Sequence, residues 1–371
     1  MPRQSPLAPL AAVVSVAVAC GDTTAMTGFA TAPPITTTPQ STSDSSSGGS
    51  STSTSTSTST STGSEDSTAS ASGTGTTGIA DVGQIPDFPT TPGCMGKIDF
   101  LFVISSEYEM AAKQVQLQEA FPAFVGILEA DFADFDYHVM VVDASLPFLN
   151  GCEGCYMCAW CGPGCTDFGG PEDYPCDEVF EDCTAVDGAG VTIVGNFDAS
   201  NTRCLPADGP RFITKDDPDL EGTFDCISKL GAGPKTPVAA RRMLKALEPE
   251  ILSKWGCNKG FLRPDALLAI VILQNGADNI SEGTPAEWYA AVLEAKKGNE
   301  DAIVTLVFSN DLDDPAPKCE GPPSGPNPLR VFADTAKHGD FASTCEPTYV
   351  PFMQTMAGTI LELCSIFIPP Q

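Results

Sequence analysis

Short apolar runs recur along residues 94–371 and alternate with segments of helical spacing. The longest runs are Ile98–Ile104, Tyr137–Val142, Leu267–Leu273 and Ala302–Phe308. Such runs, rich in β-branched and aromatic residues, are typical of strands buried on both faces of a parallel sheet. The pattern therefore predicts an α/β fold, with a doubly wound, mostly parallel sheet flanked by helices.

The segments between these runs carry apolar residues three and four positions apart, which predicts amphipathic helices. In the helix expected from Met110 onward, Pro122 should kink or split the helix. The further helices are expected at Pro285–Lys297, Pro328–Lys337 and Val350–Cys364. A further strand at the sheet edge is indicated at Val191–Phe197.

The first twenty residues are typical of an export signal. Arg3 precedes the apolar segment Leu7–Ala19, which is too short to span a bilayer. The segment ends in Ala17-Val18-Ala19-Cys20, which resembles a bacterial lipobox. We expect residues 1–19 to be removed and Cys20 to carry lipid, which anchors a chain without spanning the membrane. A plain secretory signal is the alternative.

Residues 20–93 form a linker of alternating Ser and Thr followed by Gly and Thr, with few large apolar side chains. Such a composition cannot bury enough surface to offset the entropy of ordering, which predicts disorder. We expect a flexible spacer between the anchor and the folded residues 94–371.

Most of the 15 cysteines fall within residues 146–222, which interrupt the α/β pattern and are interpreted as a Cys-rich insertion. The repeated Cys-x-x-Cys spacing suggests zinc or iron–sulfur binding in a cytosolic chain. Export favours disulfides instead, and removing Cys20 leaves an even number. We expect disulfides, with a bound metal as the alternative, and the pairing is left open.

The loop after the first strand is the main candidate site, because α/β sheets bind ligands at the carboxyl ends of their strands. This stretch resembles the opening of a von Willebrand factor A domain, which reads Asp, apolar run, then Asp-x-Ser-x-Ser before a helix. In that family the Asp and the two Ser residues hold a divalent cation, together with a Thr and an Asp from later loops. Here Ser105 stands at the Asp position, and Glu107 and Glu109 stand at the Ser positions.

The resemblance extends to later loops. Thr236, followed by Pro237, is similar to the family's Thr loop, although a helix N-cap is the other interpretation of Thr236. Asn275 stands at the position of the later Asp, with Asp278 close by in sequence. Residues 260–273 are similar to a group of bacterial, notably myxobacterial, von Willebrand A-like lipoproteins.

In that lipoprotein group a Ser-x-Cys step before the last helix is common. The resemblance therefore implies a disulfide between Cys345 and Cys364.

The substitutions at these positions predict a degenerate metal site. Glutamate side chains are longer than serine, so they overshoot the point where magnesium needs near-ideal octahedral geometry. We therefore expect no cofactor and no high-affinity magnesium site. A calcium site formed by Glu107, Glu109 and Thr236 remains the alternative, because calcium tolerates more flexible coordination.

The net charge of −29 argues against nucleic-acid partners. The chain has no Gly-x-Ser-x-Gly, His-Glu-x-x-His or P-loop motif. We expect a non-catalytic, adhesion-type binding module for a protein or glycan ligand, lipid-anchored in the cell envelope, with the outer membrane as the expected location. The alternatives are a structural envelope lipoprotein and a hydrolase that uses Glu107 and Glu109.

Overall fold

The computed structural model describes residues 93–94, 96–132, 134–145, 181–196, 198–233 and 235–368. The expected signal segment, Cys20, the linker up to residue 92 and insertion residues 146–180 lie outside the described residues. Within the described part of the chain, no helix has the length and apolar character needed to cross a membrane.

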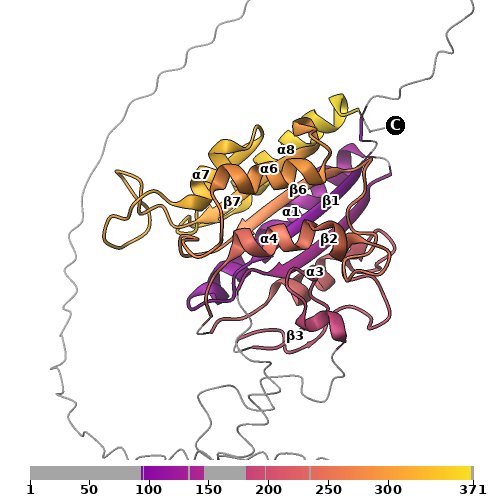
Figure 1. Ribbon diagram of the computed structural model, residues 1–371, viewed down its shortest axis with the longest axis horizontal. Helices are drawn as coiled ribbons and strands as arrows, with labels where there is room; N and C mark the ends of the chain where they lie inside the picture. Colours follow the sequence, from indigo (N-terminus) through magenta and orange to yellow (C-terminus); the bar gives the residue numbers. More distant parts are fainter. Residues whose placement is uncertain are drawn as a thin grey trace, which may run out of the picture. The chain divides into compact units, whose positions relative to one another are not determined.

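The described residues contain one mostly parallel sheet with the strand order β5-β2-β1-β6-β7-β8 (Figure 1). Its strands are β1 (Lys97–Ile104), β2 (Asp136–Asp143), β5 (Ile213–Thr214), β6 (Leu267–Leu273), β7 (Ile303–Ser309) and β8 (Gly339–Ser343). Only β5 runs antiparallel to its neighbour, β2, and the other pairs are parallel. The prediction of an α/β fold with a mostly parallel sheet is confirmed.

Helices cover both faces of this sheet. One face packs against α1 (Met110–Asp131), α3 (Leu220–Ser228) and α8 (Val350–Ile366), and the other against α4 (Ala239–Leu247), α6 (Pro285–Ala295) and α7 (Pro328–Thr335). The short elements are η2 (Asp182–Ala185), β3 (Ile193–Val194), β4 (Thr202–Arg203), α5 (Pro249–Leu252) and η3 (Glu300–Ala302).

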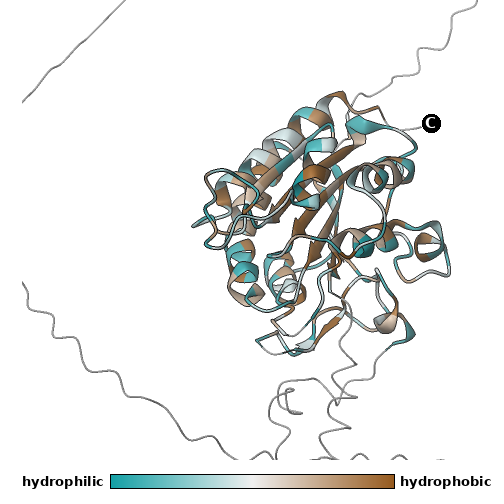
Figure 2. Ribbon diagram, turned by 60° about the vertical axis from the view of Figure 1, so that its left-hand side comes forward, coloured by the Kyte–Doolittle hydropathy of each residue, from teal (hydrophilic) through white to brown (hydrophobic). Residues whose placement is uncertain are grey.

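Strand β1 contributes to both hydrophobic cores because successive side chains of a strand point to opposite faces. Phe100 and Phe102 pack into the core beneath α1, α3 and α8, and Leu101 packs into the core beneath α4, α6 and α7. In the first core, Phe121 of α1 stacks on Phe224 of α3 with ring centroids 3.7 Å apart. Figure 2 shows the resulting distribution, with apolar strands inside and hydrophilic residues on the outer surfaces.

Some predicted details of these elements differ from the structure. Helix α1 contains Pro122 without being split, and this residue is exposed on the helix surface. The strand expected at Val191–Phe197 is only β3, which pairs with β4 in a separate ladder. The sheet edge is instead formed by β5, which lies inside the range 146–222 that was interpreted as an insertion.

The amino-terminal edge of the sheet is held by a buried ion pair. Asp99 of β1 is fully buried, and its carboxylate accepts hydrogen bonds from the backbone N–H (2.6 Å) and Nε (2.8 Å) of Arg263. Arg263 also pairs with Asp136 at the start of β2, at 2.8 Å. Burial raises the pKa of Asp99 to about 7, although the Arg263 guanidinium opposes this shift. Arg263 thus links the segment before β6 to β1 and β2.

Four disulfides join the described cysteines: Cys94–Cys364, Cys183–Cys257, Cys204–Cys226 and Cys319–Cys345. The expected pairing of Cys345 with Cys364 is therefore wrong. Cys364 lies on α8 beside the start of the domain, where the N–H of Cys94 also donates to the Cys364 carbonyl at 2.8 Å. Cys345 lies just after β8, at the other end of the sheet.

The ion pair at the amino-terminal edge gives a stability prediction. Arg263→Ala should lower the free energy of unfolding by about 3–5 kcal/mol, because it leaves the buried Asp99 carboxyl without its side-chain partner. The matched control is Arg241→Ala, which removes a half-exposed guanidinium from its pair with Asp187 and should cost about 0–1 kcal/mol. Chemical unfolding of both variants measures the difference, and equal losses would contradict this role of Arg263.

Candidate functional site

The carboxyl ends of β1 and β6 form the candidate site. These strands are adjacent, but β1 continues through α1 to β2 on one side and β6 continues through α6 to β7 on the other. This reversal is the topological switch point, where open α/β sheets leave a crevice for ligands. The N–H of Ser105 donates to the carbonyl of Leu273 at 2.8 Å, so the two strands stay paired up to the crevice.

Glu107 lies at this switch point. Its Oε1 accepts a hydrogen bond from the N–H of Gly276, in the loop after β6, at 3.0 Å. Burial raises the pKa of Glu107, while the backbone amides of Gly276 and Asn275 partly oppose the shift. The Glu107 side chain, from the loop after β1, therefore connects this loop to the loop after β6 at the switch point.

Beneath Glu107, serine hydroxyls bond to one another. Ser105 Oγ lies 3.3 Å from Oγ of Ser145, which follows β2. Ser105 Oγ also accepts a hydrogen bond from the N–H of Glu107 at 3.3 Å. Ser145 Oγ also accepts from the N–H of Ser106 at 3.0 Å. All three serines are buried. Their hydroxyls are thus used to hold the β1 loop against the end of β2.

A lysine supplies positive charge at this edge. Lys235 Nζ lies 3.0 Å from Oδ2 of Asp143, the last residue of β2. The same carboxylate accepts from Ser106 Oγ at 2.8 Å and from the N–H of Ser145 at 2.9 Å. The Asp143 carboxylate is therefore balanced by an ammonium group and two hydrogen-bond donors of the protein itself.

Thr236, next to Lys235, does not start the following helix. Helix α4 begins at Ala239 with Val238 as its N-cap, and Pro237 instead bridges to Ser145. The N-cap interpretation of Thr236 is wrong. Thr236 has no hydrogen bond to the described residues, although its neighbours Lys235 and Pro237 contact Asp143 and Ser145.

The first amides of α4 are bound by the β6 loop instead. Gln274 Oε1 accepts from the N–H of Ala239 at 3.1 Å, and Asp278 Oδ2 accepts from the N–H of Ala240 at 2.9 Å. Asp278 is buried and also accepts from Ser281 Oγ at 2.7 Å. Asp278 therefore caps a helix and does not supply the charge that Asn275 lacks.

Asn275 lies between two loops of the site. Its Oδ1 accepts from Thr344 Oγ1 at 3.1 Å, and its Nδ2 lies 3.4 Å from Glu109 Oε2. Its backbone carbonyl accepts from the N–H of Asn310 at 3.1 Å. Asn275 thus joins the loops that follow β1, β7 and β8.

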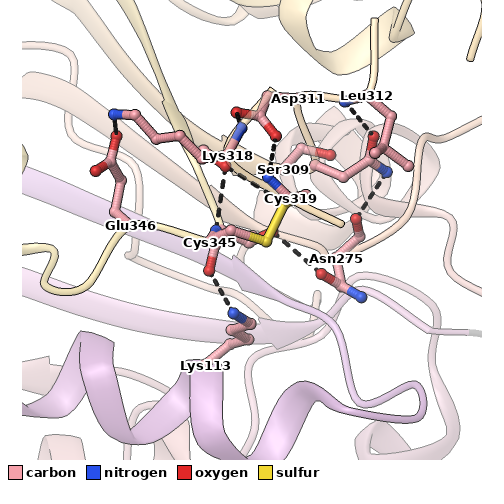
Figure 3. The surroundings of a disulfide bond; sticks show 12 residues. Lys113, Asn275, Ser309, Asp311, Leu312, Lys318, Cys319, Cys345 and Glu346 are labelled. Atoms are coloured by element: carbon pink, nitrogen blue, oxygen red, sulfur yellow. Dashed lines mark hydrogen bonds and ion pairs between the residues drawn. A yellow bond between two sulfur atoms is a disulfide. The ribbon is translucent and has the colours of Figure 1, made fainter. Parts of the chain in front are cut away.

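The Cys319–Cys345 disulfide fixes the far side of this edge (Figure 3). It ties the loop after β7 to the end of β8. Asp311 stabilises the same loop by accepting from the N–H groups of Lys318 at 2.7 Å and Cys319 at 2.9 Å. Lys318 also forms an ion pair with Glu346. The loop after β7 is therefore held in one conformation beside the site.

The oxygen atoms at this edge are not arranged to bind a divalent cation as in the family that the sequence resembles. Ser105 Oγ, Glu107 Oε1 and Asn275 Oδ1 already accept hydrogen bonds from the protein, and Asp143 is paired with Lys235. Within the described ranges, no group of three or more His, Cys, Asp or Glu side chains could hold a metal. The calcium alternative also needs Thr236, which lies between Lys235 and Pro237, the residues that contact Asp143 and Ser145.

The structure brings together Ser105, Glu107, Glu109 and Asn275 from the predicted set. Thr236 lies between two residues that contact Asp143 and Ser145, and Asp278 binds the start of α4. The sequence did not point to Lys235, which neutralises Asp143, or to Ser145, which binds Ser105 and Ser106. One signal was present for Asp143, since an acidic residue ends the second apolar run. Nothing local marked Ser145, whose contacts depend on the pairing of β1 with β2.

No family model matches the chain, and no curated protein sequence matches it either.

The raised pKa of Glu107 has a consequence for stability. Between the usual glutamate pKa of 4.5 and the raised value, the folded state binds more protons than the unfolded state. The free energy of unfolding should therefore fall as pH rises through this window. Glu107→Gln keeps an oxygen acceptor for the Gly276 N–H but has no charge to bury, so this fall should shrink.

Urea unfolding at several values between about pH 4 and pH 8 measures the effect. The control is Glu119→Gln, at an exposed position of α1, which should keep the pH dependence of the parent chain. A Glu107→Gln variant with an unchanged pH slope would show that Glu107 titrates normally.

Proposed function

We propose that this chain is an exported, non-catalytic binding module of the von Willebrand A type, and that it binds a protein or glycan through the loops at the carboxyl edge of its sheet. The doubly wound sheet, with its switch point between β1 and β6, supports the proposed fold family. The departures at Ser105, Glu107 and Glu109 make it a member with a degenerate metal site.

One observation carries the proposal, namely the conformation of the loop Glu107–Glu109. Glu107 is tied to Gly276, while the next side chain, Tyr108, is 65 % exposed. Glu109 has φ 71°, a left-handed conformation that costs a non-glycine residue roughly 1–2 kcal/mol. Strained backbone of this kind is concentrated at binding and catalytic sites. The loop holds an aromatic ring out to solvent at the place where this fold binds ligands.

A second exposed apolar side chain lies on the same edge. Ile280, in the loop after β6, is 57 % exposed. Aromatic residues are enriched among the contacts that dominate binding energy. Together with the carboxylate of Glu109, Tyr108 and Ile280 offer a mixed surface of the kind found in specific interfaces.

The contacts of the two glutamates favour binding over hydrolysis. A general acid and base must both reach the reacting group. Glu107 is turned inward to Gly276, and Glu109 lies beside Asn275. The Glu107 carboxyl is thus engaged by the protein, which leaves, among the described residues, no second free carboxyl beside Glu109 for an acid–base pair.

The start of the folded residues, at Gly93 and Cys94, is suited to attachment through a linker and a lipid anchor. The N–H of Gly93 donates to the carbonyl of Phe367 at 2.8 Å, and the Cys94–Cys364 disulfide lies next to it. Both contacts are at the amino edge of the sheet, before β1. A lipid anchor attached through this end would leave the carboxyl-edge loops free for a ligand, as proposed for a lipoprotein of the cell envelope and outer membrane.

The binding role is tested with Tyr108→Ala. This change should weaken saturable binding of the purified chain to envelope fragments of the source cells by roughly tenfold or more, as for truncation of a central aromatic contact. Glu109→Gly should also weaken binding while changing the free energy of unfolding by no more than about 1 kcal/mol, because glycine accepts the left-handed conformation.

The control for both variants is Glu119→Ala on the exposed side of α1, which should bind like the parent chain. Equal binding by the parent, Tyr108→Ala and Glu109→Gly chains would show that the carboxyl edge is not the ligand surface.

The anchoring role is tested with Cys20→Ala. A chain without this thiol cannot accept lipid at that position, so it should move from the membrane fraction to the soluble fraction. Fractionation followed by immunoblotting measures this change, and an unaltered membrane fraction would contradict a lipid anchor at Cys20.

A further inference from the structure

A groove of about 480 Å³ lies away from the carboxyl edge, between the segment after η2 and the helices α4 and α5. One wall is formed by Val186 and Asp187, and the opposite wall by Lys245, Glu248 and Ile251. The volume is within the range of about 300–1,000 Å³ that is usual for small-molecule sites. None of these residues takes part in the candidate site described above.

The groove has fixed walls. The Cys183–Cys257 disulfide joins its two sides. Gly188 has φ 79°, and a Cβ atom there would lie 2.5 Å from the backbone nitrogen of Ala246, so this wall packs directly on α4. Such fixed walls lower the entropy cost of holding a ligand.

Its polar groups are oriented and nearly balanced in charge. Asp187 is held by Arg241 and Arg242, each at 2.6 Å, and Glu248 is held by Lys245 at 2.7 Å. In a chain with a net charge of −29, a patch with matched charges suits a neutral ligand. The paired carboxylates and ammonium group present acceptors and donors in fixed directions, as hydroxyl groups require.

An exposed tryptophan lies next to the groove. Trp255 immediately precedes Gly256, which lines the groove, and its side chain is 86 % exposed. The ammonium group of Lys254 lies 5.1 Å from the ring centroid. Tryptophan offers the largest rigid apolar face of any side chain, and it is enriched at interfaces, where its ring meets a partner.

We propose that this groove is a second binding site and that its ligand is a neutral oligosaccharide. A pyranose ring has a face of C–H groups, which stacks on an aromatic ring, and a rim of hydroxyl groups, which need fixed donors and acceptors. Trp255 supplies the aromatic face, and the ion pairs of Asp187 and of Lys245 with Glu248 supply the polar partners. The site is independent of the carboxyl-edge loops.

The test uses the full chain labelled with nitrogen-15 and titrated separately with cellotetraose, chitotetraose and maltotetraose. The indole N–H signal of Trp255 is assigned by its loss in Trp255→Phe. At least one saccharide should shift this signal saturably at micromolar to millimolar concentration. The dissociation constant should rise roughly tenfold or more in Trp255→Ala, the usual effect of truncating a central aromatic contact.

Two further variants make the result specific. Glu248→Gln removes one member of the Lys245 pair and should also weaken binding, whereas Tyr108→Ala at the carboxyl edge should not. Because Trp255 is exposed, the unfolding temperature should be unchanged in Trp255→Ala, which separates lost binding from lost folding. The proposal is overturned if no saccharide shifts the Trp255 signal at millimolar concentration, or if Trp255→Ala binds as well as the parent chain.

Discussion

The position of β1 between β2 and β6 is the constraint on which the rest of the structure depends. The strand is buried on both faces, so the polar residues at each of its two ends need hydrogen-bonding partners within the protein. At its start, Asp99 is satisfied by Arg263. At its end, Ser105 and Glu107 are satisfied by the loops after β2 and β6. A change in the register of β1 would break both sets of contacts together.

Glu107 links the loops after β1 and β6 by its hydrogen bond to Gly276. A ligand at this edge would therefore contact the exposed side chains of the loops. A crevice lined by free oxygens could hold a cation, but here the oxygens are used within the protein, and the charge of Asp143 is met by Lys235. What remains available to a ligand are the side chains that the loops turn outward, such as Tyr108 and Glu109. The groove beside Trp255 differs from this edge. Its polar groups are also held in ion pairs, but they remain accessible to a ligand.

The sequence predicts the fold well where burial on both faces produces a long apolar run, as in β1, β2, β6 and β7. It misses β8, whose first residues are exposed and polar, and β5, which has only two residues. The proximity of Ser105, Glu107, Glu109 and Asn275 could be predicted, because these residues follow the adjacent strands β1 and β6. The N-cap interpretation of Thr236 was wrong because the first amides of α4 are bound by the distant β6 loop. The pairing of Cys345 with Cys319 likewise depends on how β7 and β8 lie together.

The central claim is that side chains of the protein, and not a cation, close the crevice between β1 and β6. Calorimetric titration of the full chain with magnesium, calcium and manganese tests it most directly. The contacts of Glu107, Asn275 and Asp143 predict no saturable heat with magnesium, since an ion would have to displace Gly276, Thr344 and Lys235 together. Micromolar magnesium binding that disappears in Glu107→Ala would contradict this account.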